Sequence, residues 1–394
     1  MSRQRPFVQL ADHFGITLGA AAAIATMVSV GIGISLLPPL LSLTLSARGV
    51  SERMIGLLVA TIALSALVST PFAARIAARI GTAATIATCT FIAAGIIPFV
   101  WVIRSLALLF PLVFVYGVAV TLCFVLSEYW INAVTPQQRR GFIMGLYATM
   151  LSIGFALGPG IIAILGYATI KPFIVGSLLF ALAGLPTIMA RDLSPDFGGE
   201  TRHRFLPFIF AVPAATFGVF VFAIGESSGF TFLPIWGQNL AFTPFVVPLL
   251  ASAMTLGNAL FQIPLGLLAD RFDKRIVLLI CGIIGFAGMA AAWVVAASPA
   301  ILMAVLFVWG GVTGGLYTVG LAHLASRFSG SELASATAAF IFCYALGMLI
   351  GPLAVGDSLA RWPIAGFPLV LGFVFAAYGL VMAWRIAVSR KSPA

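Results

Sequence analysis

The chain has 394 residues, of which 61% are hydrophobic and only 8% are charged. A soluble domain carries roughly a quarter charged residues, so this composition excludes an ordinary soluble globular fold. The mean hydropathy of +1.14 points to lipid as the solvent, and the formal net charge of +10 has to be explained by where the charges lie.

Apolar stretches long enough to cross a membrane recur along the whole chain. A helix needs about 20 apolar residues to cross the hydrocarbon core. Twelve spans are predicted, at about 15–41, 52–77, 82–103, 107–133, 141–167, 170–190, 206–236, 243–269, 275–297, 300–325, 333–357 and 363–386. Most connections are only a few residues long, so we expect an all-α polytopic membrane protein with antiparallel neighbouring helices.

The two halves of the chain look like copies of one unit. A displacement of 193 residues carries Gly117 to Gly310 and Pro159 to Pro352. A repeat of this length indicates that one structural unit occurs twice. We therefore predict an N-terminal six-helix bundle over residues 1–190, a cytoplasmic linker over 191–205 and a C-terminal six-helix bundle over 206–394.

The Lys and Arg residues are distributed unevenly between the two sides of the predicted membrane. With the N-terminus in the cytoplasm, 16 of the 21 basic residues lie on the cytoplasmic side and 5 on the other. This is the positive-inside pattern, and it places both termini in the cytoplasm. The net charge is then a topological signal, and no nucleic-acid partner is expected.

This plan resembles the major facilitator superfamily (MFS) of secondary transporters. Twelve spans, two parallel copies of six and a polar central link are typical of that family. The resemblance implies two pseudo-symmetric six-helix bundles, with a substrate site between them near the midplane of the membrane.

A charged loop between the eighth and ninth spans is similar to the family's G-x-x-x-D-R-x-G-R-R/K loop. It contains Gly266, Asp270 and Arg271, with Asp273 where the second glycine is usual. The corresponding loop of the first half keeps Arg79 but lacks the acid. The resemblance implies a gating latch at the cytoplasmic ends of the helices. The alternative is ordinary positive-inside loop charge.

The fifth span carries small residues and a proline at Gly145, Gly154, Gly158 and Pro159. This set is similar to the G-x8-G-x3-G-P-x2-G-G motif of proton-coupled antiporters, although the final pair of glycines is missing. The eleventh span repeats most of the set at Gly347, Gly351 and Pro352. A helix kink shared by both halves is therefore the alternative to an antiport signature.

Two carboxylates lie inside predicted spans, where a charge at the bilayer centre costs roughly 2.5 kcal/mol or more. Glu226 lies halfway along the seventh span, which lines the cavity in the resembled family. We expect Glu226 to bind and release a proton or to contact substrate, with a satisfied structural hydrogen bond as the alternative. Glu128, in the fourth span, is expected to couple protons or, by pairing with Arg79, Arg139 or Arg140, to form a cytoplasmic gate.

Other polar side chains within the spans are weaker candidates for a cavity wall. Asn258 and Gln262 share a helix face and could bind either substrate or a neighbouring helix. His323, near the end of the tenth span, is expected to be an interfacial hydrogen-bonding residue. The cavity candidates are Asn132, Thr121, Asn258, Gln262, Tyr317 and Trp130.

Motifs of the common enzyme classes are missing from the sequence. It contains no H-E-x-x-H, G-x-S-x-G or nucleotide-binding loop, and its four cysteines lie in apolar runs without a CxxC pair. We therefore expect no enzyme activity, no cofactor and no metal site.

The sequence-based hypothesis is a monomeric secondary transporter of the bacterial inner membrane. It moves a small organic solute by alternating access, by proton-coupled export. The alternative within transport is uptake of an organic acid or a sugar derivative by symport or uniport. A membrane sensor or scaffold is the alternative from another class. The expected partners are the solute, H+ and membrane lipid.

Overall fold

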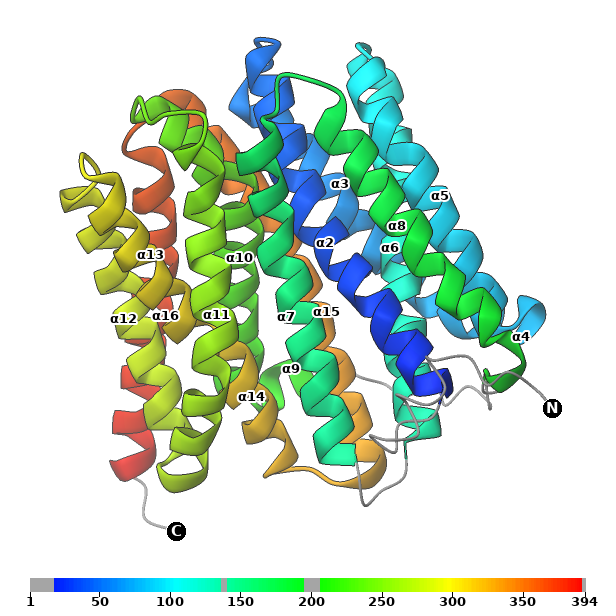
Figure 1. Cartoon of the computed structure of the whole chain (residues 1–394). Helices are drawn as coiled ribbons and strands as arrows, with labels where there is room; N and C mark the ends of the chain where they lie inside the picture. The colour runs from blue at the N-terminus through cyan, green and yellow to red at the C-terminus, as the bar shows by residue number, and fades with distance from the viewer. Residues whose placement is uncertain (1–17, 136–139, 195–205, 392–394) are drawn as a thin grey trace. The chain divides into compact units, whose positions relative to one another are not determined.

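The structure is a computed structural model, and it describes residues 18–135, 140–194 and 206–391. In these residues the regular elements are helices and no strand occurs, which confirms the predicted all-α fold (Figure 1). The α-helices are α2 (Leu18–Ala47), α3 (Glu52–Ser69), α4 (Ala73–Ile80), α5 (Thr82–Val102), α6 (Leu106–Val134), α7 (Arg140–Leu165), α8 (Lys171–Met189), α9 (Leu206–Ala211), α10 (Pro213–Asn239), α11 (Val246–Arg271), α12 (Lys274–Val294), α13 (Pro299–Thr313), α14 (Gly315–Ala325), α15 (Gly330–Arg361) and α16 (Gly366–Lys391). Short 3₁₀ turns lie at Thr70–Phe72 and Arg191–Leu193.

Twelve membrane-spanning segments are present, as predicted. Eleven helical stretches of the described chain are long and apolar enough to cross a membrane, and α7 contributes a shorter apolar stretch, Thr149–Leu165. Large apolar side chains remain exposed, among them Ile164 at 81%, Ile263 at 75% and Phe373 at 74%. Such a surface suits lipid rather than water, so the protein is a multi-pass membrane protein.

The seventh predicted span, at 206–236, is two helices rather than one. The chain breaks between α9 and α10, where Val212 has φ −132° and ψ 62°. Pro213 has no backbone N–H and cannot continue α9, but it suits the first position of a new helix. The first span was placed too short, because α2 continues through Pro38 and Pro39 to Ala47.

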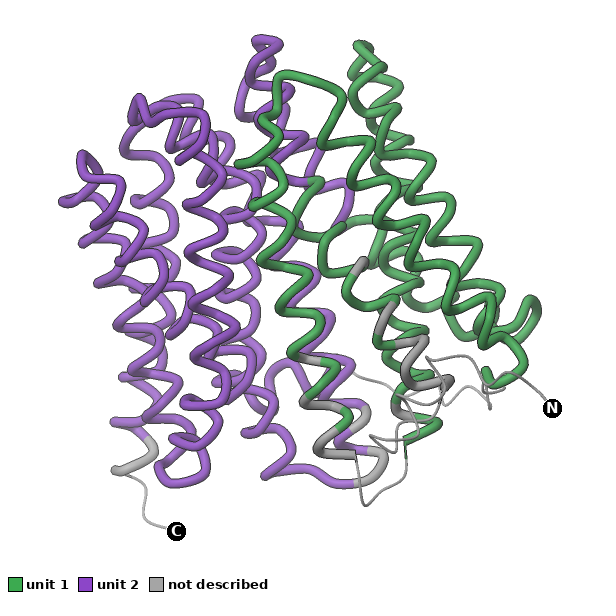
Figure 2. Tube along the Cα trace, in the orientation of Figure 1, with its two compact units in different colours: residues 1–37, 64–200 green, residues 38–63, 201–394 purple. Residues whose placement is uncertain are grey.

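The chain divides into two compact units (Figure 2). Unit 1 comprises residues 1–37 and 64–200, and unit 2 comprises residues 38–63 and 201–394. In unit 1, α5 packs against α6 and α8; in unit 2, α10 packs against α15, α11 against α13 and α12 against α16. The predicted linker lies mostly outside the described residues, and the predicted bundle limits stay a prediction.

Close helix crossings follow the same pattern in the two units. In unit 1, a Cβ on Gly158 of α7 would stand 2.1 Å from Ser35 Oγ of α2; in unit 2, a Cβ on Gly351 of α15 would stand 2.9 Å from Ser227 Oγ of α10. The glycines are 193 residues apart and the serines 192. Small residues let helix backbones approach this closely, so the internal repeat is visible in the packing.

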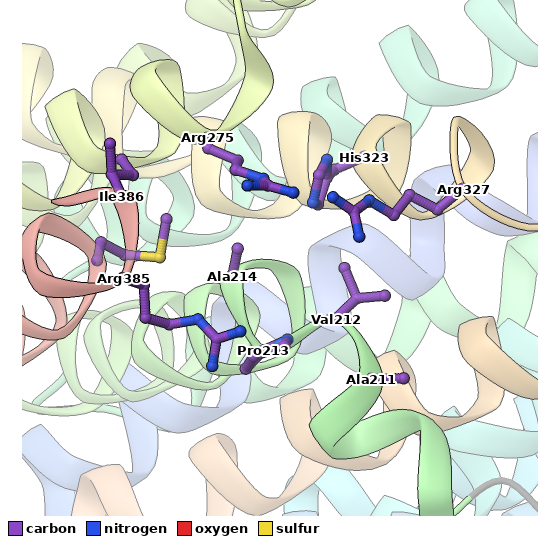
Figure 3. Close-up of a pocket in the computed structure, with 10 residues that line it drawn as sticks. Ala211, Val212, Pro213, Ala214, Arg275, His323, Arg327, Arg385 and Ile386 are labelled. Carbon is purple, nitrogen blue, oxygen red and sulfur yellow. The ribbon is translucent and has the colours of Figure 1, made fainter. Parts of the chain in front are cut away.

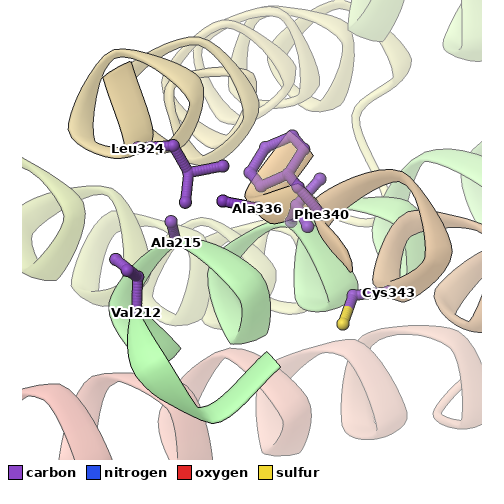
Figure 4. Packing of buried hydrophobic residues seen from close by; sticks show 7 residues of the cluster. Val212, Ala215, Leu324, Ala336, Phe340 and Cys343 are labelled. Atoms are coloured by element: carbon purple, nitrogen blue, oxygen red, sulfur yellow. The ribbon is translucent and has the colours of Figure 1, made fainter. Parts of the chain in front are cut away.

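A hydrophobic cluster joins α10, α14 and α15 in unit 2 (Figure 4). Its members are fully or almost fully buried, and Tyr317 and Tyr344 pack against it from the side. The buried members are Val212, Ala215, Val219, Leu324, Ala336, Phe340 and Cys343. This cluster fixes the three helices that carry the candidate site.

Candidate functional site

Glu226 is the central residue of α10, thirteen residues from Pro213 and thirteen from Asn239. At about 1.5 Å per residue, its Cα lies about 20 Å from either end of the helix. Its neighbours Gly225 and Ser227 are buried, whereas Glu226 itself stays partly exposed. A carboxyl group therefore lies in the middle of a spanning helix with part of its surface accessible.

Tyr344 of α15 supplies the hydrogen-bond donor for this carboxyl group. Its hydroxyl donates to Glu226 Oε2 across 2.5 Å. The helices can approach so closely because Gly347 follows one turn later on α15, where a Cβ would stand 2.3 Å from the carbonyl oxygen of Phe220 on α10. Among the described residues, no Lys, Arg or His forms an ion pair with Glu226.

Other aromatic rings pack near the ring of Tyr344. The Tyr344 ring lies 5.9 Å from that of Tyr317 and 6.4 Å from that of Phe222, measured between centroids. Tyr317 also lies 6.0 Å from Phe222 and 5.4 Å from Phe340. We call these four residues the aromatic cluster.

The acid and the aromatic cluster together define the chemistry that the site offers. Aromatic faces attract cations and stack on planar groups. A carboxyl group without a cationic partner can bind a proton or a cationic ligand. Tyr317, predicted as a cavity candidate, lies in the first turn of α14, just after the α13–α14 break at Gly314.

Glu128 lies in unit 1, on α6, and is partly exposed. The predicted partner Arg79 is exposed at the end of α4, and the structure shows no ion pair between the two. The other two predicted partners, Arg139 and the side chain of Arg140, lie outside the described residues. Thr121, on the same helix face, is partly buried.

The remaining candidates on α6 differ in accessibility. Trp130 is fully buried, and its indole N–H has no hydrogen-bond partner in the described part of the chain. Trp130 is therefore part of the packed interior of unit 1 and does not line an accessible cavity. Asn132 belongs to α6, but its side chain lies outside the described residues.

Asn258 and Gln262 are brought together on α11. Gln262 Nε2 donates to Asn258 Oδ1 across 3.0 Å, and both side chains are partly buried. Asn258 also packs against the α13–α14 break, because a Cβ on Gly314 would stand 2.9 Å from Asn258 Oδ1. The two amides bind each other, and neither hydrogen-bonds the Glu226 carboxyl group in this structure.

The charged residues at the α11–α12 connection are exposed. Asp270 and Arg271 end α11 with exposed side chains, and the space around Gly266 is empty within 4 Å of a Cβ. No ion pair of Asp270 is present among the described residues. Asp273 has a local role, since its carboxylate accepts the Arg275 N–H across 2.8 Å and caps α12.

The small residues of α7 lie at the crossing with α2. A Cβ on Gly154 would stand 2.3 Å from the carbonyl oxygen of Val28. Pro159 lies inside the helix, as does Pro352 in α15. The side-chain surroundings of Gly145 lie outside the described residues.

Three residues of the site escaped prediction, namely Phe222, Phe340 and Tyr344 as the partner of Glu226. Phe222 is one helical turn before Glu226, so the i, i+4 spacing could have suggested it. Tyr344 is 118 residues from Glu226. The spacing of Tyr344 and Gly347 on α15 was the only sequence signal for that contact.

The sequence matches one protein family over nearly its whole length. Residues 10–207 and 215–394 match the family model described as Major Facilitator Superfamily. The uncharacterized MFS-type transporter YfkF of Bacillus subtilis (strain 168) is 23% identical over 370 residues, which cover 92% of each chain. Multidrug resistance protein 2 of the same organism is 22% identical over 386 residues, covering 90% of this chain and 92% of that protein.

Solved structures share the fold at low sequence identity. A variant of the nucleoside transporter NupG has a TM-score of 0.75 and 17% identity, covering 94% of this chain and 99% of that one. A D-xylose-proton symporter has a TM-score of 0.71 and 15% identity, covering 92% and 96%. At this identity the likeness concerns the fold alone.

Proposed function

This chain belongs to the Major Facilitator Superfamily, and from that premise we propose that it exports a small organic cation in exchange for protons. The observation that carries the proposal is the carboxyl group of Glu226. It lies at the middle of α10, partly exposed, bound by the Tyr344 hydroxyl and beside the aromatic cluster. No cation of the described chain neutralises it.

In the proposed cycle, one carboxyl group serves solute and proton in turn. Deprotonated Glu226 holds the positive charge of the solute, and the rings of Tyr317, Tyr344 and Phe222 contact its apolar body. A proton that arrives from outside neutralises the carboxylate and removes the attraction, so the solute leaves. The two six-helix bundles, residues 1–190 and 206–394, are proposed to rock about the site by alternating access.

The proposal also covers the gating residues, the oligomeric state and the location of the protein. Glu128 couples or gates from α6, and Asp270, Arg271, Gly266 and Arg79 belong to the cytoplasmic latch. The protein is proposed to act as a monomer in a bacterial inner membrane, with both termini in the cytoplasm.

A second candidate is uptake of a neutral ring compound such as a sugar derivative, by symport or uniport. The aromatic cluster supports it, because sugar and nucleoside rings stack on Tyr and Phe. An organic acid suits the site less well, since the described residues bring no cation to Glu226. In that case Glu226 would accept hydrogen bonds from solute hydroxyls.

Transport by the reconstituted protein distinguishes the candidates. Liposomes with an acidic lumen would be given ethidium, a planar cation, and liposomes in acidic medium would be given radiolabelled xylose. Export by antiport predicts that ethidium accumulates as luminal protons leave, with no xylose uptake. Xylose uptake driven by external acid, without ethidium accumulation, would instead establish the second candidate.

A further inference from the structure

A small cavity lies at the end of unit 2 where α10 and α12 begin and where α14 and α16 end. Its volume is about 80 Å³. Sites for drug-sized molecules measure about 300–1,000 Å³. Pro213 lies thirteen residues before Glu226, so this cavity is about 20 Å along α10 from the carboxyl site. It is separate from the proposed transport site and too small for an organic solute of that size.

Three arginines from three different segments line this cavity (Figure 3). Arg275 comes from the first turn of α12, Arg327 from the turn after α14, and Arg385 from α16. No carboxylate lines the cavity, and none of the three guanidinium groups forms an ion pair within the described chain. The nearby carboxylate of Asp273 is engaged at the α12 N-terminus, where it accepts a backbone N–H.

A buried histidine lies between two of these arginines. His323 is only 6% exposed and lines the cavity with its ring. Its side chain makes no hydrogen bond within the described residues, and its ring nitrogens are not sealed off but open to the cavity. Figure 3 shows the ring between Arg275 and Arg327, facing the same space. This unpartnered group is an indication of a ligand that is independent of the arginines.

The backbone adds a further positive contribution. The 27-residue helix α10 begins at Pro213 on the cavity wall, and Ala214 lines the cavity as well. The N-terminus of a long helix carries a partial positive charge and is suited to bind an anion. Ordinary positive-inside charge would spread arginines over this end of the bundle, without gathering them around one buried histidine.

We propose that this cavity binds a phosphate group, held by Arg275, Arg327, Arg385 and His323. Guanidinium groups match phosphate oxygens in a bidentate manner, and three of them supply more positive charge than is needed to neutralise a doubly charged oxyanion. The imidazole supplies a further donor. The group belongs either to an anionic phospholipid at this membrane surface or to free phosphate, since both present negatively charged phosphate oxygens.

Phosphate binding at this cavity can be tested with the full chain in phosphatidylcholine nanodiscs. One arm adds inorganic phosphate, with chloride at equal ionic strength as the reference. The other arm replaces part of the phosphatidylcholine by phosphatidylglycerol. Thermal unfolding is measured in both, because a ligand that binds only the folded protein raises the unfolding temperature. The variants are Arg275→Gln and the more exposed Arg385→Gln, and the matched control is Lys274→Gln, beside Arg275 but outside the cavity.

Stabilisation by phosphate assigns a soluble ligand, stabilisation by phosphatidylglycerol alone assigns a lipid headgroup, and either result supports the site. Binding should weaken about tenfold in each cavity variant, the loss expected for one charge-assisted hydrogen bond, and should be unchanged in Lys274→Gln. If Arg275→Gln does not fold, Arg385→Gln decides. The proposal is overturned if neither probe stabilises the wild type, or if the cavity variants respond as Lys274→Gln does.

Discussion

The hydroxyl of Tyr344 lies 2.5 Å from Glu226 Oε2, so a side chain of α15 reaches the middle of α10. The contact depends on the crossing at Gly347, which leaves no room for a side chain between the two helices. A proton or a solute that binds Glu226 must therefore share the carboxyl group with Tyr344. Any movement of α10 along α15 changes this hydrogen bond.

The strength of the Tyr344–Glu226 contact is measured by a double-mutant cycle. Tyr344→Phe removes only the hydroxyl, and it should destabilise the folded protein by about 1.5–3 kcal/mol, the range for a hydrogen bond to a charged group. In a Glu226→Gln background the same change should cost clearly less, because the acceptor is no longer charged. Unfolding of the four proteins in detergent gives the coupling energy. A coupling energy of zero would show that the two side chains do not interact.

The crossing itself can be tested with an added methyl group. Gly347→Ala places a Cβ 2.3 Å from the Phe220 carbonyl oxygen, and overpacking of this kind costs about 1–3 kcal/mol. Gly95→Ala is the matched control, since nothing lies within 4 Å of a Cβ at that position in α5. The control should be neutral or stabilising by up to about 1 kcal/mol, from helix propensity. Equal stability of the two variants would contradict the close crossing.

Much of the fold follows from the sequence, because a membrane fixes the length and the polarity of each span. The twelve spans were predictable on that ground, and the family was predictable from its resemblance to a plan of twelve spans in two parallel copies. The break at Val212–Pro213 was missed, although Pro213 signals a helix start. Apolar content extended the predicted span through this break, which the structure shows in the backbone angles of Val212.

The site was less predictable than the fold. Glu226 could be recognised as a candidate from the sequence alone, because a carboxylate in a membrane span has a high free-energy cost. Its partner Tyr344 could not, because the contact depends on the register in which α10 and α15 cross. Asn258 and Gln262 share a helix face as expected, but the sequence could not show that their amides would bond to each other.

An ion-pair group near the C-terminal end of α15 should contribute little to stability. Asp357 pairs with Arg361 across 2.8 Å and with Arg53 across 3.4 Å, and both arginine side chains are more than 60% exposed. Exposed pairs are worth about 0–1 kcal/mol. Asp357→Asn should therefore change the free energy of unfolding by less than about 1 kcal/mol. A loss as large as that of Gly347→Ala would mean that solvent does not screen this group.

The proposed topology predicts which added thiols are reachable from outside the cell. The four native cysteines are buried and should not react with a membrane-impermeant maleimide. Ser51→Cys, in the exposed α2–α3 turn, should react in intact cells. Ser326→Cys, in the exposed turn after α14, should react only after the membrane is opened. The reverse pattern would invert the orientation.

Proton-coupled ethidium transport by Glu226→Gln tests the central claim most directly. Proteoliposomes with an acidic lumen would report ethidium accumulation and luminal pH together, with the exposed acid variant Glu332→Gln as the control. The account predicts that wild type and Glu332→Gln exchange protons for ethidium, whereas Glu226→Gln folds but loses the exchange. Proton-driven accumulation by Glu226→Gln at the wild-type rate would contradict it.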